Sequence, residues 1–203
     1  MRLGLFGGTF DPVHYGHLIL AELCREKCRL DEVWFLPTAV PPHKRDSELT
    51  PAETRIEMLE LAVAGNEHFA VNRYEADRGG VNYTTNTLRH FREEMPAAEL
   101  FFLMGADMLH DLPNWRESSL VCELATIVSV RRAGLPEPEF GNLSEVASDD
   151  RIEKFRRHQI EMPAIEISST DIRQRVGHGL TIRYLTTPAV EQFILSRGLF
   201  AGK

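Results

Sequence analysis

The feature that most constrains the fold is a regular alternation of short apolar runs with longer amphipathic stretches. Residues 2–6 form an apolar run that ends in two glycines, and the apolar residues of 16–30 recur at helical spacing. The alternation continues through the apolar runs 32–36 and 99–104. Strands that alternate with helices of about ten or more residues form right-handed crossovers and a parallel sheet covered on both faces. The sequence therefore predicts an α/β fold.

The remaining elements follow from the same signals. Further strands are predicted at 69–72, 125–130 and 164–167, and helices at 51–65, 84–95, 150–159, from Ser168 onward and at 188–195, with two short helices around Pro113. Residues 73–81 are polar and contain Gly79-Gly80, which predicts a loop or a weak edge hairpin. We expect one domain over residues 1–203: a Rossmann-like, doubly wound parallel sheet with a small helical C-terminal appendage at about 168–203.

Composition excludes several classes of protein. The 203 residues carry a formal charge of −7 and are 43% hydrophobic and 26% charged, as in ordinary globular proteins. The acidic balance argues against a general nucleic-acid binder, and no stretch approaches the roughly 18 apolar residues that a membrane span needs. Cys24, Cys28 and Cys122 form no C-x-x-C pair, which predicts free thiols in a reducing compartment. With no secretory signal at the start, we expect a cytoplasmic protein without nucleic-acid or membrane partners. The sequence carries no signal of an oligomeric state.

The loop after the first predicted strand is the first candidate site. It reads G-G-T-F-D-P-V-H-Y-G-H over residues 7–17 and contains no G-x-G-x-x-G pattern. Its glycines let backbone amides approach a ligand, the helix that follows offers free N–H groups, and His14 and His17 lie on one side of its first turn as potential cations. These features favour a phosphate site. A helix cap of purely structural value and a transition-metal site are the alternatives, although H-x-x-H lacks the i, i+4 spacing of helical zinc pairs.

A second candidate site is the segment I-S-S-T-D-I-R at residues 167–173. Ser168 and Asp171 have the spacing of a helix cap. Capping does not explain Arg173 and Arg175, because a cation near a helix N-terminus is unfavourable by roughly 0.3–1 kcal/mol unless an anion binds there. The segment therefore favours a second phosphate contact.

Several basic residues are predicted in loops or helix starts after strands: His14, His17, Lys44, Arg131 or Arg132, and Arg173. A localised positive pocket in an acidic protein suits a compact polyanion such as a nucleoside triphosphate. Arg131 has the alternative of being a solvated loop charge. The run Lys154, Arg156 and Arg157 is better interpreted as the solvated face of a helix.

The first loop resembles the signature of the H-x-G-H nucleotidyltransferase superfamily. Other segments resemble the bacterial nicotinate-nucleotide adenylyltransferase family: Pro41-Pro42-His43-Lys44, Arg55 with Met58, Tyr83-Thr84, Gly105-Ala106-Asp107, Trp115 and the tail from Tyr184 to Leu199. Four positions depart from the family pattern. Asn82, Asn86 and Arg116 stand where the family usually has Ser, Asp and an aromatic residue, and Arg132 replaces a proline.

The resemblance implies a nucleotidyltransferase that joins ATP to nicotinate mononucleotide in NAD biosynthesis, giving nicotinate adenine dinucleotide and pyrophosphate. It implies catalytic roles for His14, His17 and Arg173. The residues implied to bind ATP are Gly7, Gly8, Thr9, Phe10, His14, His17, Lys44, Gly105, Asp107, Arg131, Ser168, Ser169, Thr170 and Arg173. Those implied to bind the nicotinate nucleotide are Lys44, Tyr83, Thr84 and Trp115, with a plain core position as the alternative for Trp115.

This chemistry needs little from the protein beyond positioning and charge stabilisation. The nucleophile is a phosphate whose second pKa is about 6, so no general base is required, and Asp11 is expected to organise the loop. Mg²⁺ is expected to arrive with ATP, held mainly by phosphate oxygens and water, without a separate metal site in the protein. The alternatives are a related enzyme for phosphopantetheine or nicotinamide mononucleotide, and a nucleotide-binding module without turnover. Against phosphopantetheine stand the chain length, the Pro-Pro-His-Lys loop and the Tyr-Thr segment.

Overall fold

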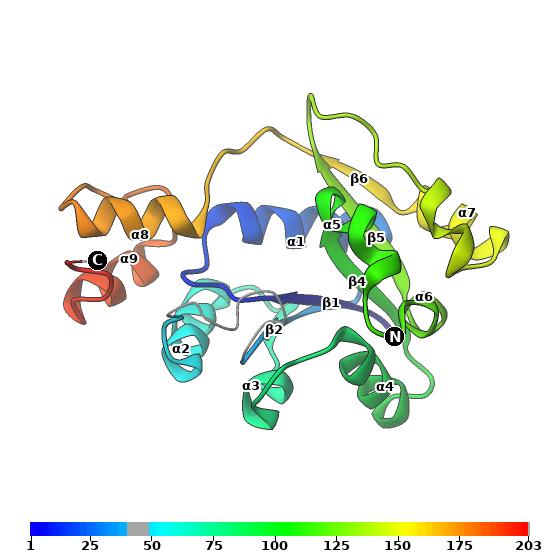
Figure 1. Cartoon of the computed structure of the whole chain (residues 1–203). Helices are drawn as coiled ribbons and strands as arrows, with labels where there is room; N and C mark the ends of the chain where they lie inside the picture. The colour runs from blue at the N-terminus through cyan, green and yellow to red at the C-terminus, as the bar shows by residue number, and fades with distance from the viewer. Residues whose placement is uncertain (40–48, 203) are drawn as a thin grey trace.

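The computed structural model describes residues 1–39 and 49–202, and its centre is one six-stranded sheet (Figure 1). The strands are β1 (Arg2–Gly8), β2 (Glu32–Pro37), β3 (Phe69–Val71), β4 (Glu99–Gly105), β5 (Thr126–Arg132) and β6 (Gln159–Met162). Neighbouring strands are all parallel and follow the order β3-β2-β1-β4-β5-β6. The predicted α/β class with a doubly wound parallel sheet is confirmed.

Helices connect the strands. They are α1 (Tyr15–Cys28), α2 (Ala52–Val63), α3 (Tyr74–Arg78), α4 (Thr84–Glu94), α5 (Ala106–Asp111), η1 (Leu112–Asn114), α6 (Ser118–Leu124), η2 (Gly141–Glu145), α7 (Asp149–Arg157), α8 (Ser169–Gly177) and α9 (Pro188–Ser196). None of the helices that the structure describes has the length and apolar character needed to cross a lipid bilayer.

The strand order positions the site. β1 pairs with β2 on one side and with β4 on the other. The chain adds β2 and β3 outward from β1 in one direction and then adds β4, β5 and β6 in the opposite direction, so the switch point of the sheet lies between the neighbouring strands β1 and β4. The loops that leave these two strands turn toward opposite faces of the sheet. Ligands of open α/β sheets bind in the crevice that this divergence creates.

Side chains alternate between two apolar layers, one on each face of the sheet. Phe101 joins the layer that contains Ala21 of α1 and Met58 of α2. Its neighbour Phe102 joins the layer that contains Leu88 of α4. This period of two lets one apolar strand bury residues on both faces, as expected for a parallel sheet covered by helices.

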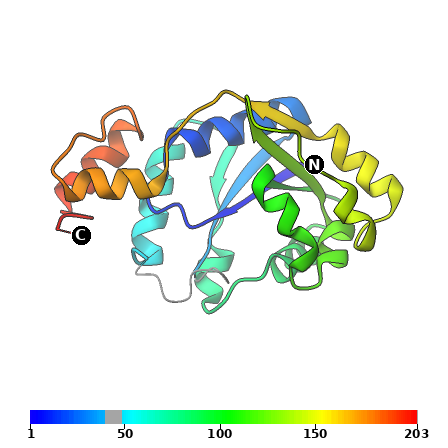
Figure 2. The ribbon, with the colours of Figure 1, turned by 45° about the horizontal axis from the view of Figure 1, so that its top comes forward.

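The C-terminal helices lie at one end of the molecule (Figure 2). The segment after β6 runs over α1 to α8 in both views (Figures 1 and 2), and Ile165 and Ile167 on it pack against the layer around α1. Ile194 of α9 belongs to the same apolar layer, and Arg197 pairs with Glu57 of α2 at 3.1 Å. These contacts bring the start of α8 next to the loop after β1.

Two predicted elements are wrong. Residues 164–167 are not the last strand, because β6 is Gln159–Met162 and pairs with β5 through Val130 and Ile160. The apolar residues of 164–167 are instead explained by packing over α1. Residues 73–81 are not a loop or hairpin throughout, because they contain the short helix α3, which ends at Gly79 and Gly80 with φ of 65° and 63°. Tertiary contacts of its buried Glu75 hold this helix.

The three cysteines are buried and free, in agreement with the prediction. Burial raises the pKa of the Cys28 and Cys122 thiols to about 11 in each case. Thiols with such raised pKa values are inert near neutral pH, so they belong to the core.

Candidate active site

Two cavities flank the loop after β1. The polar cavity, of about 880 Å³, is lined by His14, His17, Arg173 and the start of α8. The aromatic cavity, of about 470 Å³, is lined by Tyr83, Trp115 and the end of β1. Both cavities include Thr9 and Gly105, so they meet where β1 and β4 end. This junction is where two bound molecules can meet end to end.

The two histidines form a stacked pair at the start of α1. Their ring centres lie 3.7 Å apart with planes inclined by 20°. The backbone N–H of His14, the N-cap residue, donates to Nδ1 of His17 at 3.3 Å. The histidines therefore do cap α1, as the structural alternative predicted, and both rings also line the polar cavity. Because Nδ1 of His17 accepts, the proton of the neutral ring lies on Nε2, which is left as a donor.

The histidine pair is neutral near pH 7, unlike the two cations that the sequence suggested. Burial, together with the charge of Arg132, lowers the pKa of His14 from 6.5 to about 4. Burial and the neighbouring His14 also hold the pKa of His17 well below 6.5. In the ligand-free protein the pair therefore offers hydrogen-bond donors, and a bound polyanion would favour its protonation.

Two glycines are explained by close approach. A Cβ on Gly16 would lie 3.0 Å from both Cε1 and Nδ1 of His14, closer than such atoms normally pack. A Cβ on Gly105 would overlap the carboxylate of Asp107, a residue of the polar cavity. Glycine at these two positions leaves room for the side chains that line the cavity.

The second signature is joined to the first by hydrogen bonds. Ser168 caps α8 by accepting from the backbone N–H of Asp171 at 3.0 Å. Ser169 Oγ donates to the carbonyl of Pro12 at 2.8 Å, and Arg173 Nη1 donates to the carbonyl of Asp11 at 2.6 Å. One cavity is therefore lined by residues of both segments: Thr9, His14, His17, Ser168, Ser169, Thr170 and Arg173.

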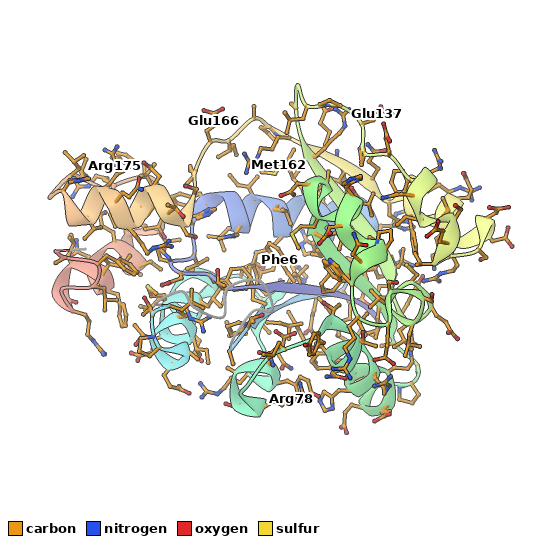
Figure 3. All side chains as sticks on the ribbon, in the orientation of Figure 1. Phe6, Arg78, Glu137, Met162, Glu166 and Arg175 are labelled. Carbon is orange, nitrogen blue, oxygen red and sulfur yellow. The ribbon has the colours of Figure 1, made fainter. Side chains whose placement is uncertain are left out.

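Arg175 lies apart from this site. Its Nε donates to the carbonyl of Thr181 at 2.9 Å. Figure 3 shows Arg175 on α8 at the edge of the molecule, whereas Phe6 lies near the centre. Of the two arginines that the sequence placed near the start of this helix, only Arg173 lines the polar cavity.

Arg55 supports the loop from beneath, a role that the sequence did not predict. The side chain is 1% exposed and donates to the carbonyls of Thr9 at 2.6 Å, Thr38 at 2.8 Å and Thr50 at 2.9 Å. Burial lowers the pKa of this guanidinium, and nearby Asp11 opposes the shift. The ends of β1 and β2 are thus tied together by one buried cation, and the match of Arg55 to a family motif was its only sequence signal.

Asp11 itself has the features of a loop organiser. It is 1% exposed, and its Oδ2 accepts a hydrogen bond from the backbone N–H of Thr50 at 3.2 Å. Its carbonyl is the acceptor for Arg173. Asp11 therefore connects the loop after β1 both to the start of α2 and to α8.

The adjacent residues Arg131 and Arg132 differ in their partners, although both line the polar cavity. Arg131 is ion-paired with Glu161 and donates to the carbonyl of Leu135 at 3.1 Å. Within residues 1–39 and 49–202, the Arg132 side chain has no hydrogen-bond or ion-pair partner, and its charge acts on His14. The sequence named Arg131 or Arg132 as basic residues of the site, and the resemblance implied Arg131 as the ATP contact. In the structure Arg131 is engaged by Glu161, and Arg132 is the one whose charge is available to a ligand.

The aromatic cavity brings together the residues predicted for the nicotinate side. Tyr83, Thr84 and Trp115 all line it. The ring centre of Trp115 lies 6.1 Å from that of Phe102 at a nearly perpendicular angle, and the guanidinium of Arg116 lies 4.8 Å from the centre of the Tyr83 ring. The predicted group thus comes from the start of α4 and the segment after η1, and Phe102 of β4 lies against it.

A buried carboxyl group, Glu75, is a cavity residue that the sequence did not predict. Its two oxygens accept hydrogen bonds from the hydroxyls of Thr38 and Thr87, both at 2.7 Å. Burial raises its pKa, and the two hydroxyls oppose the shift. Asn82 donates to the carbonyl of Glu75 at 3.0 Å and accepts from the N–H of Ala39 at 2.8 Å. Asn82, which differs from the serine usual in the family, therefore links α3 to the residues that follow β2.

Some predicted residues lie elsewhere than expected. Gly7 and Gly8 line the aromatic cavity, not the polar one. Phe10 is 1% exposed and packs against Phe6 and Phe35, so its side chain belongs to the core. Lys44 lies outside the described residues.

Within the described part of the chain, no three or more His, Cys, Asp or Glu side chains group as metal ligands. The carboxylates on the wall of the polar cavity are Asp11 and Asp107 among these residues. Asp11 is already engaged by Thr50.

Comparisons with known proteins agree with this architecture. A family model described as cytidylyltransferase-like matches residues 5–175. A "probable nicotinate-nucleotide adenylyltransferase" of Thermomicrobium roseum is 43% identical over 98% of this chain and 91% of its own length. The protein of the same name from Moorella thermoacetica is 42% identical, over 98% and 91% respectively.

A solved structure shares the fold. It is the Plasmodium falciparum nicotinic acid mononucleotide adenylyltransferase complexed with NaAD, which superimposes with a TM-score of 0.76 over 98% of this chain and 97% of its own, at 18% identity. The full-length relatives and the family match together decide the assignment. The chain belongs to the cytidylyltransferase-like family and, within it, to the nicotinate-nucleotide adenylyltransferases.

Proposed function

We propose that the two cavities hold the two substrates of adenylyl transfer from ATP to nicotinate mononucleotide. The products are nicotinate adenine dinucleotide and pyrophosphate, a step in NAD biosynthesis. The observation that carries the proposal is the junction of the cavities at Thr9 and Gly105. It lets a phosphate held from one cavity reach a phosphorus atom held from the other.

The reaction needs no proton acceptor from the protein. An oxygen of the mononucleotide phosphate attacks the α-phosphorus of ATP, a new P–O bond forms, and the bond to the bridging oxygen breaks as pyrophosphate leaves. The attacking phosphate is largely ionised at neutral pH, since its second pKa is about 6. The lack of a need for a general base is consistent with a site rich in hydrogen-bond donors and cations. The carboxyl group of Asp11 then stabilises the loop by accepting a hydrogen bond from Thr50.

We assign ATP to the polar cavity. His17 Nε2–H would donate to the α-phosphate, and the stacked His14 would hold it in place; Thr9, Gly105 and Asp107 would complete the wall toward the nucleoside. Placing a donor where charge develops in the transition state is a large contribution to catalysis. Arg173, with Ser168, Ser169 and Thr170, would bind the β- and γ-phosphates at the N-terminus of α8. Arg132 would add a further positive charge to this group.

Mg²⁺ enters this scheme as part of the substrate, bound to the phosphates of ATP and to water. Lys44 is proposed to bind both substrates. The proposed acceptor site is the aromatic cavity, where Tyr83, Thr84 and Trp115 would face the pyridine ring. We further propose that the reaction runs in the cytoplasm, where ATP is available and thiols stay reduced.

The test is pyrophosphate release from Mg·ATP with nicotinate and nicotinamide mononucleotides at matched concentrations. Fast release with the acid form and slow release with the amide form would support the assignment. Equal release with both would contradict the proposed acceptor while leaving the transferase chemistry intact. Absence of release with either acceptor would overturn the proposed reaction.

A further inference from the structure

The aromatic cavity has an uneven distribution of charge. Of the described residues that line it, Arg116 alone carries a positive charge and Glu75 alone a carboxyl group. Glu75 is buried and accepts hydrogen bonds from two threonine hydroxyls, whereas the Arg116 side chain is 58% exposed. A molecule that enters from solvent therefore meets Arg116 as the cation of this cavity.

Arg116 is held in place without its charge being consumed. Its guanidinium lies over the ring of Tyr83, with 4.8 Å between the guanidinium carbon and the ring centre. Its backbone carbonyl accepts a hydrogen bond from Thr85 Oγ1 at 2.6 Å. Glu117 is its ion-pair partner only at 3.9 Å, while the other oxygen of Glu117 lies 3.1 Å from Arg89. A planar guanidinium held against a ring in this way presents a preorganised set of donors.

The orientation of the mononucleotide in the aromatic cavity follows from the proposed reaction. Its phosphate must lie at the junction near Thr9 and Gly105, because there it can reach ATP in the polar cavity. The pyridine ring, with its carboxylate, must then extend into the part of the cavity formed by Tyr83 and Trp115. Arg116 lines the aromatic cavity but not the polar one, as expected for a residue at the ring end.

We infer that Arg116 binds the ring carboxylate of the acceptor and so strengthens the preference for the acid form over the amide. This inference rests on the proposed function, because it assumes that the aromatic cavity holds the mononucleotide. The carboxylate accepts charge-assisted hydrogen bonds from the guanidinium, while a neutral amide accepts weaker ones.

The test compares Arg116→Gln with the unmodified enzyme, using pyrophosphate release from saturating Mg·ATP. Arg116→Gln is expected to lower kcat/KM for nicotinate mononucleotide by about 10- to 100-fold, mainly through KM, because a charge-assisted hydrogen bond is lost. For nicotinamide mononucleotide the change is expected to stay below about 3-fold, so the acid preference shrinks. Arg116→Lys, which keeps the charge, is expected to retain part of the preference.

Arg89→Gln is the matched control, since Arg89 contacts the same Glu117 but does not line either cavity. It is expected to leave the acid-to-amide ratio unchanged, and circular dichroism checks the fold of every variant. Equal losses with acid and amide in Arg116→Gln would overturn the inference, as would an equal effect of Arg89→Gln. A wild-type enzyme that uses neither mononucleotide would instead overturn the proposed function.

Discussion

Arg173 Nη1 donates a hydrogen bond of 2.6 Å to the backbone carbonyl of Asp11, a residue 162 positions earlier in the chain. This bond joins the start of α8 to the loop that carries His14 and His17. A second hydrogen bond joins the same two segments, because Ser169 Oγ donates to the carbonyl of Pro12, the next residue after Asp11. The two segments therefore form one wall of the polar cavity.

Replacing Arg173 with alanine is expected to weaken the binding of ATP more than the binding of the mononucleotide. The change removes a cation from the polar cavity and leaves the carbonyl of Asp11 without its donor. We expect the KM for ATP to rise by about 10-fold or more, since hydrogen bonds to charged groups contribute roughly 1.5–3 kcal/mol. Steady-state kinetics with each substrate varied in turn would measure this.

Arg175→Ala provides the control on the same helix, because Arg175 bonds to Thr181 outside the cavity. It is expected to leave both KM values within about 2-fold of wild type, as exposed charges contribute little. If Arg173→Ala weakened the binding of ATP and of the mononucleotide equally, the result would argue against a specific contact between Arg173 and the triphosphate.

His17→Ala is expected to lower turnover by about 10²-fold or more, as the loss of one preorganised donor commonly does. The ring supplies Nε2–H to the cavity, because its Nδ1 accepts from the backbone of His14. Single-turnover rates at saturating substrate would measure the effect, and circular dichroism would check the fold. Near-normal turnover in a folded variant would remove His17 from the proposed mechanism.

Arg132→Gln is expected to raise both the KM for ATP and the pKa of His14. Burial and, after it, the positive charge of Arg132 lower that pKa to about 4. Titration of the His14 ring by NMR would show the upward shift, and the rise in KM is expected to be about 3- to 10-fold for one exposed charge. Arg131→Gln should act differently, by loosening the contact to Glu161 and β6. An unmoved His14 titration in Arg132→Gln would contradict the assigned coupling.

Acid should destabilise the folded protein through His14. In the unfolded chain the imidazole takes up its proton near pH 6.5, but in the fold only near pH 4. Between these values the unfolded state binds more protons, so the free energy of unfolding falls as the pH is lowered from 6.5 toward 4, by about 1–3 kcal/mol from this residue. Urea unfolding at a series of pH values would measure it. His14→Asn is expected to lack this part of the slope, and an unchanged slope in that variant would assign the effect to other groups.

Much of the fold and part of the site could be predicted from the sequence, because those signals are local. Apolar runs ending in glycine indicated strands, and helical spacing indicated α1. Glycines with His14 and His17 after a strand indicated an anion site at the carboxyl edge of the sheet. The two incorrect elements show the limit of such signals. The apolar residues of 164–167 look like a strand in isolation, but they pack against the apolar layer around α1, and the strand that pairs with β5 is Gln159–Met162.

What only the tertiary structure decided depends on distances between residues that are remote in the chain. The sequence by itself determined the α/β class, the family and the two phosphate signatures. Burial keeps the histidine pair neutral, and Glu161 pairs with Arg131 while the charge of Arg132 stays available. Four backbone carbonyls surround the Arg55 guanidinium. Charge state and partner choice depend on desolvation and on atoms within a few ångströms, and neither is encoded in local periodicity.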